Sequence, residues 1–469
     1  MAKRVAIAAI GTMGDVRPYV ALALGLKSAG FDVVIGTSTD FAGFISEHGI
    51  EFWDLGSDVQ AFISSASFEQ MMSKRAIIHA PSLLNEGQKI LKEAGRNAWD
   101  MAQTADILVF HMNTTFCIDM AEALDIPAIM TAFQPLNPTA EFPYFAYEGK
   151  PLDPLFRTAG TRSNATRRPG PVSAMRKKSN GFSIDPIVNR LTYIMAAAQQ
   201  SYYDLPRDRL RTKLLGLKAK RRGGFMRNSR GEQLISLHAY SPTIVPRPRD
   251  WPDRAIVTGY WQLEDKSGWK PSSEFRAFLD RGPPPVYLGF GSMPWGAERN
   301  TQIITEAVKR WGGRAVISKG WGGMSAESLP ETIFPIERAP HTELFKYVEA
   351  VVHHGGAGTT HEGLYAGLPT FVVPQFFDQP YWGKRVHQLG AGPAPVRLKK
   401  LTPAILAQAL HDLSTKTSHL VAAEAIRARM KAERGVTRAV EVIDAALVLD
   451  SAKRHATPVR ELTPVHAAS

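Results

Sequence analysis

The stretch HHGGAGTTHEGLYAGLP, residues 353–369, follows a short apolar run at residues 350–352. The apolar run predicts a buried strand, and Gly355, Gly356 and Gly358 leave the backbone uncovered where that strand ends. The polar residues after the glycines predict the first turn of a helix. A strand, a glycine-rich turn and a helix N-terminus together present free N–H groups and the positive end of a helix dipole. The stretch therefore predicts a diphosphate site; the alternative is a tight turn that needs glycine for its geometry alone.

Two side chains of the same stretch suit a nucleotide. His354 can give phosphate oxygens a hydrogen-bond donor or a positive charge. Glu362 lies one turn inside the expected helix, where a carboxylate can accept hydrogen bonds from ribose hydroxyls. His353 and His354 are adjacent, which is not a metal-ligand spacing, so we interpret His353 as structural and expect no metal.

A second glycine turn, VYLGFGSMP at residues 286–294, also follows an apolar run. Gly289 and Gly291 would let Ser292 approach a phosphate with its N–H group and its hydroxyl. Two such turns in one domain, at the same edge of a sheet, favour a diphosphate more strongly than either turn alone.

A third segment, FFDQP, comes after an apolar run at residues 370–373. Asp378 and Gln379 stand side by side there, at the expected carboxyl end of a strand, where they can accept from and donate to sugar hydroxyls. Such a pair alone is also typical of an ordinary surface turn.

Short apolar runs alternate with helical patterns along the whole chain. Runs that are apolar on both faces predict a parallel sheet covered by helices on both sides. The expected strands are residues 5–10, 31–36, 106–110, 127–131, 234–240 and 255–258, and then 285–290, 314–318, 350–353 and 370–373.

The stretch SPTIVPRPRDWPDR, residues 241–254, separates the two series of strands and is too rich in proline for a helix. We therefore predict an α/β protein with two doubly wound, Rossmann-like domains that face each other across a cleft, where a shared ligand would bind. The expected parts are an N-terminal acceptor-binding domain (1–245), a linker (246–262), a C-terminal nucleotide-sugar-binding domain (263–445) and a tail (446–469) that is disordered or crosses back.

The motif GTMGDVRP, residues 11–18, ends the first expected strand and places Asp15 at the interdomain cleft. A carboxylate there could take a proton from an acceptor hydroxyl. It is a weak base, so an apolar pocket would have to exclude water from it. The alternative is that Asp15 only caps the following helix.

These motifs resemble those of a known family. HHGGAGTT with Glu362, followed by DQPYWGKRV, resembles the donor signature of the UDP-dependent glycosyltransferases with the GT-B fold. VYLGFGSMP, SKGWGG, RAPH, SPTIVPRPRDWP and GTMGDVRPYVALALGL are most similar to the sterol 3-β-glucosyltransferase branch. The resemblance covers about residues 1–60 and 230–445, while the stretch between them diverges.

The resemblance implies a role for each matching residue. Asp15 would be the catalytic base, Glu362 would bind the ribose, and Asp378 and Gln379 would bind the donor sugar. Diphosphate binding would fall to a larger set: Gly291, Ser292, His354, Gly356, Gly358, Thr359 and Thr360. The plant enzymes of the family carry a uracil-stacking Trp where this chain has Arg338, which leaves uridine and thymidine donors open.

An apolar acceptor would need a pocket in the N-terminal half. His111, Phe133, Phe142 and Tyr144 lie around the expected position of that pocket. Ordinary core packing is the alternative for these rings.

The charge of the chain favours an anionic partner. Lys and Arg number 56 against 44 Asp and Glu, which gives +12 with neutral His. Basic residues concentrate between residues 157 and 230, and we expect residues 157–180 to form a mobile loop. This region could lie on anionic lipid headgroups or could simply be solvated. No nucleic-acid-binding motif accompanies the charge.

Two further features bear on location. The apolar run at the N-terminus is too short for a signal sequence, and no run reaches the roughly 18 apolar residues of a membrane span. We therefore expect a cytoplasmic protein that can also contact a membrane peripherally. The single cysteine, Cys117, excludes an internal disulfide and reads as a small buried hydrophobe.

The function expected from these observations is the transfer of a hexose, with inversion, from a UDP-sugar to a hydroxyl of a sterol or similar apolar acceptor. The hexose that we expect is glucose. The UDP-sugar would be a co-substrate, and no cofactor would be needed. Three alternatives stay open: a natural-product glycosyltransferase with a macrolide, flavonoid or glycolipid acceptor, whose donor could be a dTDP-sugar; a sugar-nucleotide epimerase; and a binder of nucleotide sugars without activity.

Overall fold

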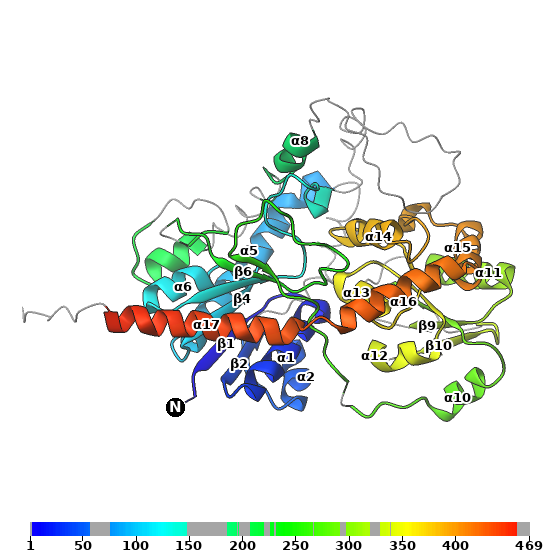
Figure 1. Cartoon of the computed structure of the whole chain (residues 1–469), viewed down its shortest axis with the longest axis horizontal. Coiled ribbons are helices and arrows are strands. Elements are labelled where there is room, and N and C mark those ends of the chain that lie inside the picture. Colours follow the sequence, from blue (N-terminus) through cyan, green and yellow to red (C-terminus); the bar gives the residue numbers. More distant parts are fainter. Residues whose placement is uncertain are drawn as a thin grey trace, which may run out of the picture.

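The computed structural model describes residues 2–56, 76–147, 185–194, 196, 207–219, 226–228, 231–265, 267–290, 297–318, 329–337 and 339–456. Two α/β domains lie side by side in it, each built on its own parallel sheet (Figure 1). The prediction of two doubly wound domains is therefore confirmed.

The first sheet has seven parallel strands in the order β3-β2-β1-β4-β5-β6-β7. They are β1 (Arg4–Ala8), β2 (Asp32–Thr37), β3 (Glu51–Asp54), β4 (Ile107–His111), β5 (Ala128–Ala132), β6 (Ile235–His238) and β7 (Ala255–Val257). The accompanying helices are α1 (Met13–Ser28), α2 (Ala42–Glu47), α5 (Ala76–Ala102), α6 (Cys117–Leu124) and α8 (Asp185–Thr192).

Alternate residues of each central strand enter two separate cores. In β1, Ala6 and Ala8 pack under α5 and α6, whereas Val5 and Ile7 pack under α1. Because both faces of the sheet are covered, its central strands are apolar throughout instead of alternating. Cys117 is buried in the α5–α6 core, which confirms its reading as a small hydrophobe.

The second sheet has five parallel strands in the order β10-β9-β8-β11-β12. They are β8 (Val286–Gly289), β9 (Ala315–Ser318), β10 (Ile333–Ile336), β11 (Ala350–His353) and β12 (Thr370–Val372). The helices of this domain are α10 (Ser273–Leu279), α11 (Ala297–Trp311), α12 (His341–Leu344), α13 (Ala357–Tyr365), α14 (Gln379–Gln388), α15 (Pro403–Thr415) and α16 (Thr417–Lys431).

The predicted linker needs correction, whereas the tail takes one of its two expected courses. β7 lies inside the predicted linker 246–262, because its backbone pairs with β6 and completes the first sheet. The tail from residue 446 is expected to be disordered or to cross back, and up to residue 456 it crosses back: it continues helix α17 (Gly435–Ala456), whose Ala439, Ile443 and Ala446 pack against the first domain. Residues 457–469 lie outside the described residues.

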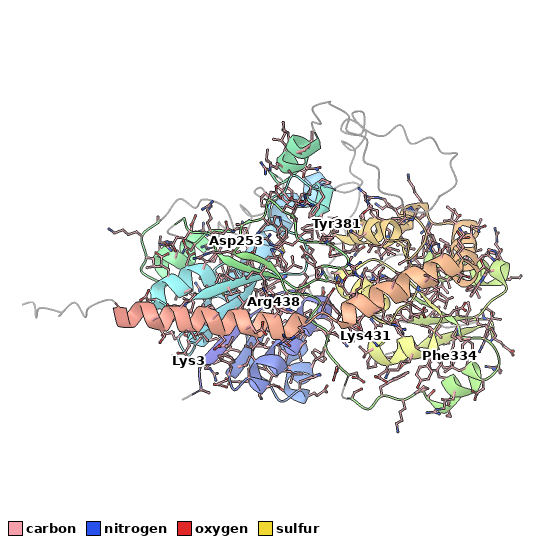
Figure 2. The ribbon with its side chains drawn as sticks, in the orientation of Figure 1. Lys3, Asp253, Phe334, Tyr381, Lys431 and Arg438 are labelled. Atoms are coloured by element: carbon pink, nitrogen blue, oxygen red, sulfur yellow. The ribbon has the colours of Figure 1, made fainter. Side chains whose placement is uncertain are left out.

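The chain thus passes between the domains twice, once after β7 and once between α16 and α17. Figure 2 shows Lys431 on α16 and Arg438 on α17 on either side of the second passage. Gly259 has φ +110°, and a Cβ atom on it would lie 3.1 Å from the Cα atom of Gly435. The two passages therefore touch, backbone against backbone.

Candidate active site

The N-terminus of α13 has the geometry that an anion site needs. Gly356 is its N-cap residue, and Gly355 has φ +92°, a conformation that favours glycine. The first amides of a helix have no partner within it, so the N–H groups of Ala357, Gly358 and Thr359 are left for a ligand. Ala357 was not predicted, because its side chain carries no signal and only its backbone matters.

Thr360 is placed differently from the other residues expected at the diphosphate. Its hydroxyl donates to the Gly356 carbonyl at 2.9 Å, and its N–H donates to the same carbonyl at 3.0 Å. The side chain is completely buried. Both of its polar hydrogens are thus used inside the helix, so the geometry of this turn suits a diphosphate contact better at Gly358 and Thr359 than at Thr360.

The two histidines at the end of β11 have different surroundings. His353 is buried, and its Nδ1 accepts a hydrogen bond from the Gly355 N–H at 2.9 Å, so it shapes the turn. Burial lowers the pKa of His354 to about 4, although its interaction with the Gly289 backbone partly opposes this. His354 is therefore neutral near pH 7 in the unliganded protein and offers a hydrogen-bond donor, not a positive charge.

Glu362, the expected ribose ligand, lies where three parts of the chain meet. The Tyr260 hydroxyl donates to its Oε1 at 2.9 Å, and Arg17 Nη2 of α1 lies 3.9 Å from the same oxygen. Burial raises the pKa of Glu362, and Arg17 and Tyr260 partly oppose that rise. Neither Arg17 nor Tyr260 was predicted here, although Arg17 belongs to the GTMGDVRP motif.

Asp378 and Gln379, expected at the donor sugar, begin α14. Trp382 Nε1 donates to Asp378 Oδ2 at 2.8 Å, and Gln134 Nε2 of the first domain donates to the same oxygen at 3.1 Å. Gln379 Oε1 accepts from the backbone N–H groups of Gln375 and Phe376, which holds the preceding loop. Gln134 was missed, although it follows β5 at the same sheet edge as the other polar residues.

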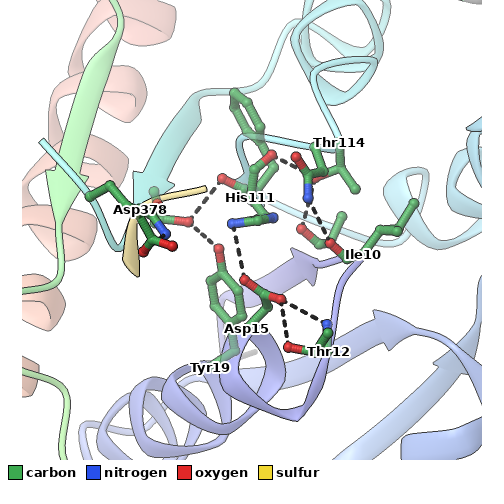
Figure 3. A network of polar contacts seen from close by, with 12 residues as sticks. Ile10, Thr12, Asp15, Tyr19, His111, Thr114 and Asp378 are labelled. Atoms are coloured by element: carbon green, nitrogen blue, oxygen red, sulfur yellow. Dashed lines mark hydrogen bonds and ion pairs between the residues drawn. The ribbon is translucent and has the colours of Figure 1, made fainter. Parts of the chain in front are cut away.

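Asp15, the expected base, sits in the first turn of α1. Its Oδ2 accepts from the Thr12 N–H at 2.7 Å and from the Thr12 hydroxyl at 3.1 Å, so Thr12 is the N-cap and Asp15 completes a capping box. Its Oδ1 points the other way, 3.8 Å from His111 Nε2 (Figure 3). One carboxylate oxygen thus fills the capping role, and the other faces His111.

Asp378 lies in the same close view as Asp15, although the two residues belong to different domains (Figure 3). Burial raises the pKa of Asp378; the bonds from Gln134 and Trp382 oppose this rise, and the negative charge of Asp15 adds to it. The fold therefore brings the expected base and the expected sugar ligand together.

The residues expected around the acceptor are divided between the core and the domain junction. Phe133 and Tyr144 are buried in the two cores of the first domain, as ordinary packing predicts. Phe142 is partly exposed and contacts Tyr381 of α14, with 6.1 Å between ring centroids; Figure 2 labels Tyr381 at this junction. His111 ends β4 beside Asp15.

Some predicted features lie outside the described residues: Gly291, Ser292, Arg338 and the basic loop 157–180. Within the part of the chain that the structure describes, no group of three His, Cys, Asp or Glu side chains is arranged to hold a metal ion. None of the described helices is long and apolar enough to cross a membrane.

Family models match both domains. Residues 5–139 match the Glycosyltransferase family 28 N-terminal domain, and residues 316–446 match the Erythromycin biosynthesis protein CIII-like, C-terminal domain. A sterol 3-beta-glucosyltransferase of Arabidopsis thaliana is 32% identical over 450 residues, which cover 92% of this chain and 64% of the relative. One of Neosartorya fischeri is 32% identical over 461 residues, 94% of this chain and 29% of the relative. The chain thus spans less than two thirds of the length of these relatives.

Solved structures share the arrangement of the two domains. The glycosyltransferase SnogD from Streptomyces nogalater aligns with a TM-score of 0.61 at 16% identity, covering 95% of this chain and 100% of that one. The Streptomyces sp. SF2575 glycosyltransferase SsfS6, complexed with thymidine diphosphate, aligns with a TM-score of 0.57 at 17% identity, covering 94% and 99%. At this identity the likeness shows a common fold.

Proposed function

The chain belongs to the glycosyltransferases of the GT-B fold, in the branch of the sterol 3-beta-glucosyltransferases, and from this membership we propose that it glycosylates an apolar alcohol. The proposed donor is a uridine diphosphate hexose, and UDP-glucose is the one that we expect. The acceptor is a sterol or a similar lipid, and the configuration at the anomeric carbon inverts.

In the proposed reaction, the acceptor oxygen attacks the anomeric carbon while the bond to the diphosphate breaks. Asp15 Oδ1 takes the hydroxyl proton, since its Oδ2 is already committed to Thr12. The leaving diphosphate gains negative charge, which the N–H groups at the start of α13 and His354 stabilise more in the transition state than in the ground state. These groups serve the leaving group without a metal.

The observation that carries this proposal is the meeting of two half-sites across the domain junction. The second domain supplies the open helix N-terminus and Asp378, and the first supplies Asp15 and Gln134. A base on one domain beside a sugar ligand on the other is the arrangement that transfer between two substrates requires. An epimerase acts on the donor alone and does not need an acceptor half-site.

Two measurements test the proposal. Calorimetry should detect binding of UDP, and incubation with UDP-glucose should release UDP and form a glycoside only when a sterol is present. A parallel incubation with dTDP-glucose decides between the two bases. Absence of affinity for any nucleoside diphosphate would remove the enzyme assignment altogether.

Asp15→Asn tests the base. Loss of a general base costs roughly 10²–10⁴-fold in turnover, so we expect transfer nearly to vanish. UDP affinity should stay within about twofold, because Asp15 does not belong to the diphosphate site. The variant also weakens the capping box by about 1 kcal/mol, so its thermal midpoint must be measured beside its turnover. Near-wild-type transfer by a folded variant would refute the assignment.

We also propose that helix α8 brings the enzyme to an anionic bilayer, where an apolar acceptor resides. Ile187 and Leu191 are four residues apart on one face of α8, and Ile194 follows just after the end of the helix; the three are 53%, 55% and 64% exposed. The helix projects from the body of the molecule (Figure 1), and Asn189 anchors it through the Ala140 carbonyl. In sequence, α8 follows the basic residues between 157 and 178, which suit anionic headgroups.

Sedimentation with vesicles that contain phosphatidylserine tests this contact. Ile187→Ser with Leu191→Ser should lower the bound fraction severalfold, whereas Val421→Ser with Leu449→Ser, at positions 59% and 62% exposed on other helices, should not. High salt should weaken wild-type binding. Equal binding by both double variants would exclude α8 as the docking element.

A further inference from the structure

His111 is a buried imidazole that the reaction described above does not use. It is 2% exposed, at the carboxyl end of β4. Among the described residues, neither of its ring nitrogens makes a hydrogen bond of normal length and angle, although the Ile10 backbone lies near the ring. A buried polar group without a partner is costly, and such groups in folded proteins are commonly satisfied by a ligand or by ordered water. A ligand or water that satisfies His111 would have to lie in the direction in which one of its ring nitrogens points.

The ring is held so that one nitrogen faces Asp15. It stacks on Phe133 with 5.5 Å between centroids, and the edge of Tyr19 meets it at 6.2 Å. Tyr19 is itself fixed by a hydrogen bond between its hydroxyl and that of Thr131, which in turn donates to the Phe110 carbonyl. With the ring held in this way, His111 Nε2 points toward Asp15 Oδ1.

The gap between these two atoms matches a bridging oxygen. At 3.8 Å, Nε2 and Oδ1 are too far apart for a direct hydrogen bond, but one oxygen can lie about 2.8 Å from both. The Asp15 side chain is 25% exposed, so a ligand can reach it from outside. Building on the proposed function, we propose that the acceptor hydroxyl occupies this gap, donating to Asp15 Oδ1 while its oxygen accepts from His111 Nε2–H.

The protons in this arrangement are accounted for. Burial lowers the pKa of His111, an effect that the Asp15 carboxylate and the Ile10 backbone partly oppose, so the ring is neutral and carries one N–H. The neighbouring carboxylate favours the tautomer with this hydrogen on Nε2. During transfer the hydroxyl proton moves to Asp15, the oxygen bonds to the anomeric carbon, and His111 keeps its own proton. His111 thus holds the nucleophile and does not act as the base.

Two substitutions separate this role from packing. His111→Phe keeps an aromatic ring beside Phe133 but removes the N–H, and His111→Gln supplies an amide N–H at similar length. For each protein, the affinity for a sterol and for its analogue without the 3-hydroxyl is measured in the presence of UDP. Wild type should bind the sterol more tightly than the analogue. The ratio of these two affinities should fall roughly 3- to 10-fold in His111→Phe, and His111→Gln should recover part of the loss. Turnover should follow the same order.

The controls keep failures distinguishable. UDP affinity should be the same in all three proteins, because His111 lies outside the diphosphate site. If wild type binds UDP and forms glycoside but His111→Phe keeps full preference and turnover, or His111→Gln falls as far as His111→Phe, the role of His111 is refuted while the function stands. If wild type binds no UDP, the function itself falls.

Wild-type protein labelled with 15N-histidine provides a test that needs no variant. Saturating sterol should shift one imidazole N–H signal, and the analogue without the hydroxyl should not. A spectrum that the sterol leaves unchanged would overturn the proposal even if both substitutions impaired folding.

Discussion

Donor binding should tighten as the pH falls, because of His354. Burial holds the pKa of this imidazole at about 4 in the unliganded protein, so it carries no charge near neutrality. A charged donor hydrogen-bonded to phosphate gains about 1.5–3 kcal/mol, and each 1.4 kcal/mol raises a pKa by one, so a bound diphosphate should raise this pKa by about 2. The bound state then takes up a proton that the free state lacks. Linkage predicts roughly fourfold higher affinity at pH 5.5 than at pH 7.5.

Calorimetry with UDP-glucose, without acceptor, measures this dependence. UDP-glucose suits the experiment because it has no terminal phosphate that titrates near pH 6. Titrations in buffers of different ionisation enthalpy report the proton uptake directly. His354→Gln, which cannot be protonated, should bind with the same affinity at both pH values. A wild-type affinity that stays constant between pH 7.5 and 5.5, or a variant that repeats the wild-type slope, would refute the role of His354.

Two other predictions follow from the same turn and from the buried histidines. Gly355→Ala should lower the free energy of unfolding by about 1–3 kcal/mol and abolish UDP binding, because φ is +92° and the new Cβ would lie 2.6 Å from Val372 Cγ1. Urea unfolding measures the stability, and calorimetry measures the binding. A stable variant that binds UDP would contradict the prediction. Acid should destabilise the fold, since burial lowers the pKa of His238, His341 and His361 from 6.5 to about 4. The unfolded chain binds more protons, so stability falls as the pH drops below about 6.5, by about 1 kcal/mol per histidine at pH 5.5; a urea midpoint that does not move between pH 7 and 5.5 would argue against it.

The architecture was predictable because buried parallel strands are apolar on both faces and therefore visible in the sequence. Two strands escaped the prediction. β3 is a short edge strand with acidic residues at both ends, and β10 is an edge strand that contains Pro335. Edge strands need neither continuous apolar character nor a full set of N–H donors, so their signals are weak.

The candidate site was predictable where function depends on backbone geometry and less so where it depends on tertiary contacts. The residue types of Gly355 and Gly356 are enough to predict the turn before α13. The buried orientation of Thr360 follows from packing, which the motif does not encode. Gln134 meets Asp378 across 244 residues of sequence, and Tyr260 meets Glu362 across 102, so no local pattern could have paired them.

The contact between Gly259 and Gly435 has a mechanical consequence. The two passages of chain that join the domains meet there backbone to backbone, since a Cβ atom on Gly259 would lie 3.1 Å from the Gly435 Cα atom. A side chain at either glycine would therefore have to push one passage away from the other. The contacts of Gln134 with Asp378 and of Arg17 with Glu362 also cross between the domains, so we expect such a displacement to disturb the alignment of the two half-sites.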